Sequence, residues 1–332
     1  MATVELSIDL GSKYITIYQK GIGLVLCEPA LVIATMANHK TELREAGYRA
    51  QSIMADSLGG ARVMAPIKDG IVVDEETAAM MLKYFLKKIL PSSIIPPSIK
   101  AIVSICSSSS GSDRRAVEKC CLKAGIKEVT LVEAPLSLLA YTGSIGGLIV
   151  DIGGGKTEIA AVTNRGIAAG CSVNIAGDAF NNAIIDRMFS LYGVKVGEYT
   201  VENLKQSALS FYDNDGSVYS VMGSGKDGSP RSIDISSVEL QNAVIPLMDD
   251  ILEVVMSILH QAPPELVAEV KRKGLFLTGG SVHIPGIKEY IEYKLDLDVI
   301  LLRDNENAIA IGGAQFFDNK ELLGNMLGIK LK

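Results

Sequence analysis

The sequence predicts an α/β protein made of two related halves with a cleft between them. Strand-like and helix-like segments alternate along the whole chain, which is typical of an α/β fold. The opening pattern VELSIDLGSKYITIYQKG, from residue 4, restarts near the middle as GLIVDIGGGKTEIAAVTNRG, from residue 147. Each copy heads a block of roughly 140 residues, an ordinary size for one domain. The restart therefore indicates two duplicated α/β domains.

The first half, residues 1–142, is expected to form domain I, with a small subdomain inserted around 30–75. Its predicted strands are VELSIDL, ITIYQ, LVLCE, AIVSIC and VTLVEAP. A helix is expected over 75–88, because Ala79, Leu82, Phe85 and Leu86 share one helical face. RRAVEKCCLKAG predicts a second helix that ends at Gly125, a plausible C-terminal cap. LSLLAYTG predicts a third, short helix.

The second half, residues 143–332, is expected to form domain II, with a small subdomain inserted around 178–245. It opens with a strand, a glycine-rich turn, a second strand and a hairpin turn. Helices are expected over 178–192 and 200–211, and a hairpin in VYSVMGSGKDGSPRSIDIS. Ser236 or Ser237 is a candidate cap for a helix from about 238 to 260. LFLTGG predicts a strand, and PGIKEYIEYKL a helix with Pro285 near its start.

Composition limits the classes of function. Of the 332 residues 48% are apolar, enough for a large core, and the net charge of -6 argues against nucleic acid as the main partner. The five cysteines show no C-x-x-C spacing and the three histidines are scattered, so we expect reduced core cysteines in a cytosolic protein and no metal cluster. No signal peptide and no uncharged apolar run of spanning length is evident.

The two Asp-x-Gly turns are the features that carry chemistry. Asp9 and Gly11 in the first half match Asp151 and Gly153 in the second at the same spacing. Glycine lets the backbone approach phosphate oxygens, and a carboxylate at each strand end suits Mg²⁺ held through water. One such turn is common and means little alone. Two in register, each opening a half-chain repeat, favour a nucleoside triphosphate site.

GGGKT in the second turn is similar to a P-loop only superficially. Val150 stands where the P-loop template needs its first glycine. The residues that follow, TEIAAV, predict a strand, whereas a P-loop leads into a helix. We therefore exclude a P-loop.

Together these segments resemble one known family. DLGSKYITIY, GLVLCEPALV, APIKDGIVVD, LVEAPLSLLA, VDIGGGKTEIAAV, IAGDAFNNAII, APPELVAEVKRKGLFLTGGS and IPGIKEYI resemble successive motifs of the MreB family, within the actin/Hsp70/sugar-kinase superfamily. They occur in family order from about residue 5 to 315. The resemblance implies duplicated actin-like (ribonuclease-H-like) domains with a nucleotide cleft between them.

The resemblance also implies roles for particular residues. The first phosphate loop of the family corresponds to Asp9, Gly11, Ser12 and Lys13. The second corresponds to Asp151, Gly153, Gly154, Gly155, Lys156 and Thr157. Asp9 and Asp151 would organise Mg²⁺ and water. Glu133 would orient or deprotonate the water that attacks ATP; the alternative is a structural carboxylate.

Three further motifs match the part of the family's site that binds the nucleoside. Gly177 and Asp178 resemble the turn beside the ribose. Glu202 and Lys205 match a helix that lines the adenine pocket, although a solvated helix face remains the alternative. The adenosine loop of the family corresponds to Gly279, Gly280 and Ser281.

The sequence departs from the family at several places. Lys156 replaces a threonine of the usual GGGTT, and Lys13 and Tyr14 replace small or polar residues. SSSSGSD stands where the family has a turn with proline, and Ala134 replaces one residue of an acidic pair. We therefore expect ATP binding with slow hydrolysis.

The resemblance implies a filament-forming ATPase that uses ATP/ADP and Mg²⁺ and lies peripherally on the inner face of the cell membrane. Its implied partners are further copies of itself, the anionic membrane surface and membrane-embedded cell-wall elongation proteins. Ile94 and Ile95, between prolines, are the expected membrane-inserting pair; packing of both on the domain is the alternative. Other functions left open are a nucleotide-dependent membrane scaffold without useful hydrolysis and a sugar kinase. An Hsp70-like chaperone is disfavoured because little chain remains for a peptide-binding domain.

Overall fold

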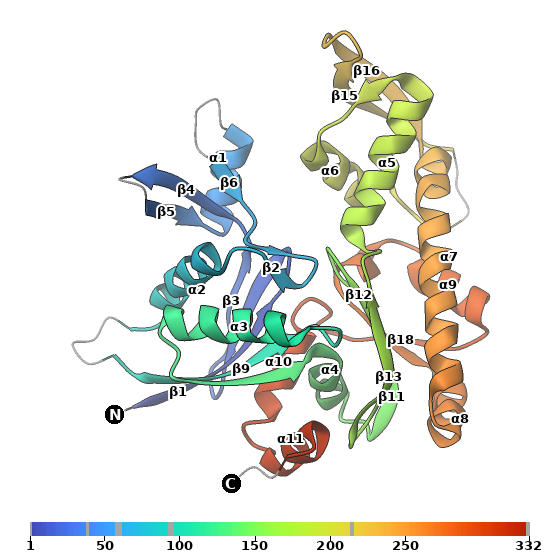
Figure 1. Ribbon diagram of the computed structural model, residues 1–332. Helices are drawn as coiled ribbons and strands as arrows, with labels where there is room; N and C mark the ends of the chain where they lie inside the picture. Colours follow the sequence, from blue (N-terminus) through green and yellow to red (C-terminus); the bar gives the residue numbers. More distant parts are fainter. Residues whose placement is uncertain (1, 38–39, 57–61, 92–95, 213–215, 330–332) are drawn as a thin grey trace. The chain divides into compact units, whose positions relative to one another are not determined.

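The computed structural model describes residues 2–37, 40–56, 62–91, 96–212 and 216–329 (Figure 1). The chain forms two compact units. Unit 1 comprises Met1–Gly146, Val162–Ile167 and Glu306–Lys332, and unit 2 comprises Gly147–Ala161 and Ala168–Asn305. The C-terminal segment thus belongs to the unit that begins the chain. The expected α/β class is confirmed in both units.

Unit 1 is built on a five-stranded sheet with strand order β10-β9-β1-β2-β3. β1 is parallel to β9 and antiparallel to β2, and β10 is parallel to β9. The strands of this sheet are β1 (Thr3–Leu10), β2 (Tyr14–Gln19), β3 (Gly23–Pro29), β9 (Ser98–Ile105) and β10 (Glu128–Glu133). All five predicted strands of this half are therefore present.

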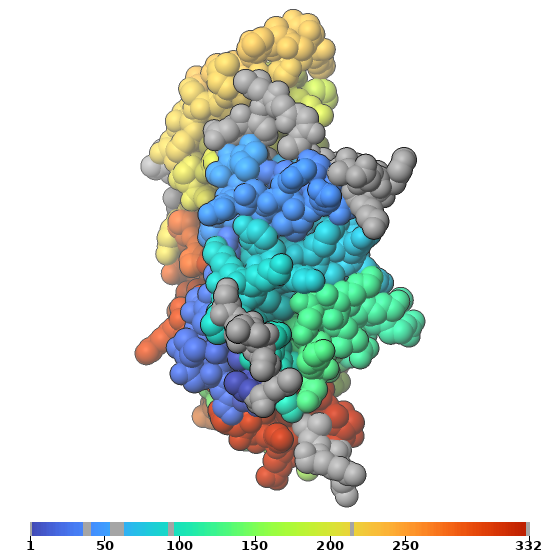
Figure 2. Space-filling view, turned by 90° about the vertical axis from the view of Figure 1, so that its left-hand side faces the viewer, coloured from blue at the N-terminus to red at the C-terminus, as the bar shows by residue number. Residues whose placement is uncertain are grey.

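Helices cover both faces of this sheet. They are α2 (Glu75–Ile89), α3 (Gly111–Ala124), α4 (Ala134–Thr142), α10 (Ala308–Gln315) and, at the C-terminus, α11 (Lys320–Leu327). Leu6 and Ile8 of β1 lie in one core cluster with residues of α2 and α3, which pack side by side at the surface (Figure 2). Ser7 faces the other way, as strand alternation requires, and meets Gly313 of α10.

The remaining elements of unit 1 form two small sheets and one helix. One sheet has the order β5-β4-β6, and the other pairs β7 with β8. Their bounds, with the helix, are β4 (Val32–Ala37), β5 (Lys40–Ala46), α1 (Tyr48–Asp56), β6 (Arg62–Met64), β7 (Ile67–Lys68) and β8 (Ile71–Val72).

Unit 2 repeats the plan with a five-stranded sheet of order β13-β12-β11-β17-β18. β11 is parallel to β17, and β17 to β18. The strands are β11 (Gly146–Ile152), β12 (Thr157–Thr163), β13 (Gly166–Val173), β17 (Leu275–Thr278) and β18 (Val299–Leu301). Because Thr157 opens a strand and not a helix, the exclusion of a P-loop is confirmed.

The helices of unit 2 and its small sheet complete the second core. The helices are α5 (Gly177–Tyr192), α6 (Glu198–Ala208), α7 (Ser237–Gln261), α8 (Pro264–Lys273), the 3-10 helix η1 (Gly280–His283) and α9 (Ile287–Leu295). The small sheet joins β14 (Val194–Lys195) to the predicted hairpin, β15 (Val218–Gly225) and β16 (Pro230–Ser236). Ser236 caps α7, so the first of the two candidate caps is the correct one.

Two of the expectations from composition are met in the described part of the chain. All five cysteines are free, and Cys106, Cys120 and Cys121 are buried. Burial raises the pKa of the Cys120 thiol to about 12, as expected for a cysteine that acts as a small apolar core residue. Among the described residues, no helix combines the length and apolarity needed to cross a membrane.

Candidate functional site

The first glycine-rich turn, Gly11–Lys13, connects β1 to β2 in unit 1. Asp9 lies near the end of β1, where it pairs with Thr16 of β2, and Thr16 pairs in turn with Cys27 of β3. The Asp9 carboxyl is half-buried, and burial raises its pKa to about 7. A cation beside this carboxyl would favour its ionised form, because an opposite charge offsets the cost of desolvation.

Two hydrogen bonds hold the first turn in place. The backbone N–H of Gly70, next to β8, donates to the Ser12 hydroxyl at 2.8 Å. The N–H of Ala30 donates to the Lys13 carbonyl, also at 2.8 Å. The Ser12 hydroxyl and the Lys13 carbonyl are therefore both engaged with the rest of unit 1.

Three backbone hydrogen bonds within unit 2 involve the second turn, Gly153–Lys156. The Gly153 N–H donates to the Lys156 carbonyl at 3.0 Å and closes the turn between β11 and β12. The Gly153 carbonyl accepts from the Gly177 N–H at 3.1 Å, and the Gly154 carbonyl from the Asp178 N–H at 2.7 Å. Two successive carbonyls of the turn are thus directed at the start of α5.

This direction of the carbonyls determines where the next N–H groups lie. In a trans peptide the N–H points away from the carbonyl of the same unit. With the Gly153 and Gly154 carbonyls aimed at α5, the N–H groups of Gly154 and Gly155 point away from it. Successive N–H groups in a turn can bind an anion. The direction of these carbonyls therefore makes the second turn a candidate for contact with phosphate.

The start of α5 also anchors a polar cluster on α6. The buried Lys205 ammonium donates to the Gly177 carbonyl at 3.1 Å and to the Glu202 carboxylate at 3.0 Å. Asn181 donates to the same carboxylate oxygen at 2.6 Å. Burial opposes ionisation of Glu202, but the Lys205 charge and the hydrogen bonds from Asn181, Lys205 and Gln206 outweigh it and hold the pKa of Glu202 below its usual value.

The cluster differs from the sequence-based expectation at Lys205 and adds Asn181 to the predicted residues. The alternative of a solvated helix face is wrong for Lys205, because its side chain is buried. Asn181 was not singled out, although it lies one helical turn after Gly177, a spacing that places both on the same side of α5. Its Oδ1 atom is buried and has no hydrogen-bond partner among the described residues. The polar lining of this region thus extends one residue beyond the predicted set.

The adenosine-loop motif packs against the end of β11. A Cβ atom on Gly279 would lie 2.4 Å from the Ile152 carbonyl oxygen and 2.5 Å from Oδ1 of Asp151. The Ser281 hydroxyl donates to the Gly153 carbonyl at 3.3 Å. Gly280 begins η1 and has open space around its Cβ position. Three predicted motifs, at 151–157, 177–178 and 279–281, therefore meet in unit 2, and Lys205 joins them.

The side chains of two further predicted residues, Thr157 and Glu133, are engaged in contacts with the protein itself. Thr157 is buried, and its hydroxyl donates to the Ile175 carbonyl at 2.6 Å. Glu133 ends β10 in unit 1, and its carboxylate forms an ion pair with Arg114 of α3. Ile94 and Ile95 lie outside the described residues.

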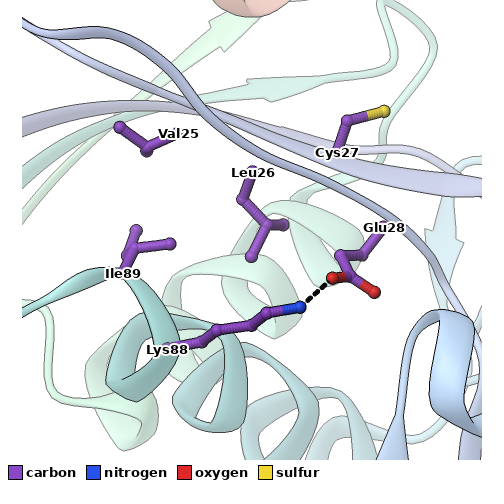
Figure 3. A pocket seen from close by; sticks show the side chains of 6 residues that line it. All are labelled: Val25, Leu26, Cys27, Glu28, Lys88 and Ile89. Carbon is purple, nitrogen blue, oxygen red and sulfur yellow. Dashed lines mark hydrogen bonds and ion pairs between the residues drawn. The ribbon is translucent and has the colours of Figure 1, made fainter.

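A shallow pocket of unit 1 contains none of the predicted site residues. It is lined by Val25, Leu26, Cys27, Glu28, Lys88 and Ile89 (Figure 3). Lys88 of α2 points to Glu28 of β3, and the two form an ion pair. Glu28 is buried and also accepts from the N–H of Tyr48, at the start of α1. The charges of the pocket are thus used to join β3, α1 and α2.

Comparison with known proteins identifies matches over nearly the whole chain. The family model described as MreB/Mbl protein matches residues 3–325. The cell shape-determining protein MreB of Escherichia coli is 31% identical over 98% of this chain and 97% of its own length. The cell shape-determining protein Mbl of Bacillus subtilis is 28% identical over 96% of this chain and 97% of its own length.

Solved structures give the same picture. MreB5 of Spiroplasma citri bound to AMPPNP has a TM-score of 0.87 and 26% identity, covering 99% of this chain and 100% of that one. The same protein bound to ADP has a TM-score of 0.85 over 96% and 97% of the two chains. The MamK double helical filament, at 19% identity and a TM-score of 0.81 over 95% and 99%, shows likeness of fold.

Proposed function

The chain belongs to the MreB/Mbl family of bacterial actin-like proteins, and from this we propose that it binds ATP and ADP and assembles into filaments. We further propose that these filaments lie on the cytoplasmic face of the cell membrane and organise cell shape and wall synthesis. Membrane-embedded proteins of wall elongation and anionic lipid would then be its partners.

The observation that carries nucleotide binding is the convergence of motifs in unit 2. The Gly153 carbonyl accepts hydrogen bonds from the α5 start and from Ser281, and Lys205 contacts Gly177. These segments are far apart in the sequence, so their meeting is not a local effect. Backbone N–H groups in a turn suit an anionic ligand. The likeness to structures bound to AMPPNP and ADP supports a nucleotide as that ligand.

Equilibrium titration of the purified chain with fluorescent ATP and ADP tests this proposal. We expect saturable binding of both nucleotides, and competition by unlabelled ATP. A variant at the α5 start, Asp178→Ala, retains its backbone N–H and serves to separate the side chain from the backbone contact. Absence of saturable binding by the wild-type chain contradicts the proposal.

Mg²⁺ is proposed to accompany the nucleotide, with Asp9 and Asp151 as its protein ligands through water. Both are carboxylates, the oxygen donors that Mg²⁺ prefers. The described residues contain no group of three or more acidic, histidine or cysteine side chains that would hold a metal. Bound Mg²⁺ would supply charge neutralisation of the phosphates.

Hydrolysis of ATP is proposed to be slow, with Glu133 positioning the attacking water. A carboxylate can serve this role because in-line positioning matters more than covalent help in phosphoryl transfer. Lys156 stands in the second turn in place of the family's threonine. We expect Lys156→Thr to raise the steady-state rate of phosphate release by about tenfold, or about 1.4 kcal/mol of barrier. Lys195→Thr, at an exposed lysine of unit 2, is the control.

A second candidate function follows from the same lysine. A cation in the phosphate turn favours retained phosphate, so a nucleotide-dependent membrane scaffold without useful hydrolysis is the alternative. Phosphate release measured beside sedimentation distinguishes the two. Filaments that form with ATP and disassemble as phosphate is released support the ATPase. Filaments that persist with no release support the scaffold. Phosphorylation of a sugar from a panel would instead support a metabolic kinase.

Membrane binding is proposed to depend on Ile94 and Ile95. Two apolar side chains give weak binding that a filament multiplies through avidity. We expect Ile94→Ser with Ile95→Ser to abolish pelleting with anionic liposomes and to leave nucleotide binding intact. Ile145→Ser, at an isoleucine that is 71% exposed, is the matched control. Unchanged pelleting of the double variant would refute this assignment.

A further inference from the structure

The side chain of Glu133 is held by an arginine from a neighbouring helix. Glu133 is the N-cap residue of α4, yet its side chain makes no capping hydrogen bond. Instead, Nη2 of Arg114 donates to its Oε1 atom at 2.5 Å. The Glu133 side chain is 18% exposed and that of Arg114 36% exposed. The carboxylate is therefore directed at Arg114 and away from the end of its own helix.

Arg114 is itself fixed by the start of α3. Ser110 and Asp113 form a capping box there, which satisfies N–H groups at the first turn of the helix. Arg114 lies in this turn, and its Nε donates to the Ser109 carbonyl at 3.5 Å. The next residue, Arg115, is exposed. The two adjacent arginines thus differ in their surroundings. In the part of the chain that the structure describes, Arg114 contacts Glu133 and Arg115 does not.

The ion pair occupies one oxygen of the carboxylate. A carboxylate has two oxygens and about four acceptor sites, so Oε2 retains full capacity to accept from water. An arginine donor also restrains the rotation of the glutamate side chain, since the guanidinium is planar and its donors have fixed directions. A water hydrogen-bonded to Oε2 would then have a defined position. Positioning to within about 1 Å matters in catalysis, because misplacement of that size costs about 100-fold in rate.

We propose that Arg114 is a positioning residue for ATP hydrolysis, which holds Glu133 so that Oε2 accepts from the attacking water. This inference rests on the proposed function, in which Glu133 orients that water. Arg114 takes no part in bond making. Its contribution is to the order of the catalytic carboxylate, and its loss should lower kcat without weakening ATP binding.

Steady-state phosphate release from the full chain tests the proposal, with kcat and KM for ATP determined separately. We expect Arg114→Met to lower kcat about tenfold and to leave KM within about twofold, as for loss of an interaction used in the chemical step. Arg114→Lys, which keeps a donor and the charge but not the planar guanidinium, should recover part of the loss. Arg115→Met is the matched control and should behave as the wild type.

A double variant separates positioning from a general structural effect. Once Glu133→Gln has removed the carboxylate, Arg114→Met should cost nothing further, because the two residues act as one unit. Additive losses overturn the inference, as do an unchanged kcat in Arg114→Met or an increase in KM alone. If Arg114→Met does not fold, Arg114→Lys provides the test. A kcat of Arg114→Lys no higher than that of Glu133→Gln then overturns the inference.

The outcomes also separate this inference from the proposed function. If the wild type releases no phosphate, or if Glu133→Gln is as fast as the wild type, the proposed role of Glu133 fails and Arg114 loses its role with it. If Glu133→Gln is slow while Arg114→Met is fast, only the positioning inference fails.

Discussion

The two glycine-rich turns begin from the same sequence plan but are held in the fold in different ways. The first turn is fixed through the Ser12 side chain and through the Lys13 carbonyl near its end. The second is fixed through the backbone carbonyls of Gly153 and Gly154, which accept from the start of α5 and from Ser281. The two units thus share the sequence plan of the turn but hold it through different contacts.

The difference shows which part of each turn is available for a ligand. In the second turn the Gly153 and Gly154 carbonyls accept hydrogen bonds and the following N–H groups point away from α5. In the first turn a side chain carries the hydrogen bond from Gly70, and the nearby functional group is the Asp9 carboxyl. Under the proposed function, the second turn would contact phosphate and Asp9 would face the cation.

The largest effect is expected where the second turn meets the adenosine loop. Gly279 has a φ of 94°, which disfavours other residues, and its Cβ position lies 2.4 Å from the Ile152 carbonyl oxygen. We expect Gly279→Ala to lower the free energy of unfolding by about 3 kcal/mol or more and to abolish nucleotide binding. Urea denaturation and nucleotide titration measure the two effects.

The neighbouring residue provides the control for this variant. No protein atom of the described residues lies within 4 Å of the Cβ position of Gly280. Gly280→Ala should therefore stay close to the wild type in urea denaturation. Equal losses in the two variants would mean that the close contact with β11 does not determine the second turn.

The next largest effect compares the equivalent glycines of the two turns. A Cβ on Gly11 would lie 2.6 Å from the Tyr14 carbonyl oxygen, whereas on Gly153 it would lie 3.1 Å from that of Lys156. The first contact requires the backbone to move, and the second requires only a small shift. We expect Gly11→Ala to destabilise by about 2 kcal/mol and Gly153→Ala by less than about 1 kcal/mol. Urea denaturation of the two variants tests this order. A larger loss of unfolding free energy in Gly153→Ala would mean that the Cβ distances do not determine the cost of substitution in these turns.

Much of the fold was predictable because its signals are local. Ser236 precedes α7 with Glu239 three residues later, and both form the capping box that such spacing predicts. Gly125 ends α3 in the left-handed conformation expected of a C-terminal glycine. Apolar runs likewise located all strands of the large sheet in unit 1 and three in unit 2, β11, β12 and β17, but not the short β18. These features depend on residues close together in the chain.

Helix α10 shows what local signals cannot provide. Its sequence, AIAIGGAQ, contains two adjacent glycines, which disfavour a helix, and the sequence analysis assigned none there. Packing explains the helix, because a Cβ on Gly312 would lie 1.9 Å from the Ser137 carbonyl oxygen of α4. Only glycine permits this close approach. The cost of glycine is offset by contacts with residues far away in the sequence.

The same limit applies to the candidate site. The repeated turns identified Asp9 and Asp151, since their spacing is visible within one short motif. The ion pair between Arg114 and Glu133 joins residues on different elements, and no periodicity indicates it. Asn181 became evident only when α5 and α6 were seen to share a hydrogen-bonded cluster. Side chains that support a functional residue are therefore the part that the sequence conceals.

The smallest effect is expected from the charge of Glu202, which supports the second turn only indirectly, through Lys205. The pKa of Glu202 is lower in the folded chain than its usual value, so its ionised form stabilises the fold. This stabilisation is fully present above the pKa of an unfolded glutamate, about 4.3, and is lost as the pH falls through the lower folded value. The unfolding free energies of the wild type and Glu202→Gln should therefore differ most at neutral pH and converge in acid.

Urea denaturation between neutral and acidic pH, without nucleotide, measures this convergence. Glu253→Gln, at an exposed glutamate of α7, controls for the loss of one negative charge from unit 2. A difference in unfolding free energy between the wild type and Glu202→Gln that stays constant down to acid pH would contradict this expectation. Such a result would mean that the cluster stabilises the fold through packing and not through the charge of Glu202. Convergence in acid would instead mean that the charge of Glu202 holds Lys205 against the start of α5. The second turn would then depend on the ion pair between Glu202 and Lys205, two helical residues outside the turn itself.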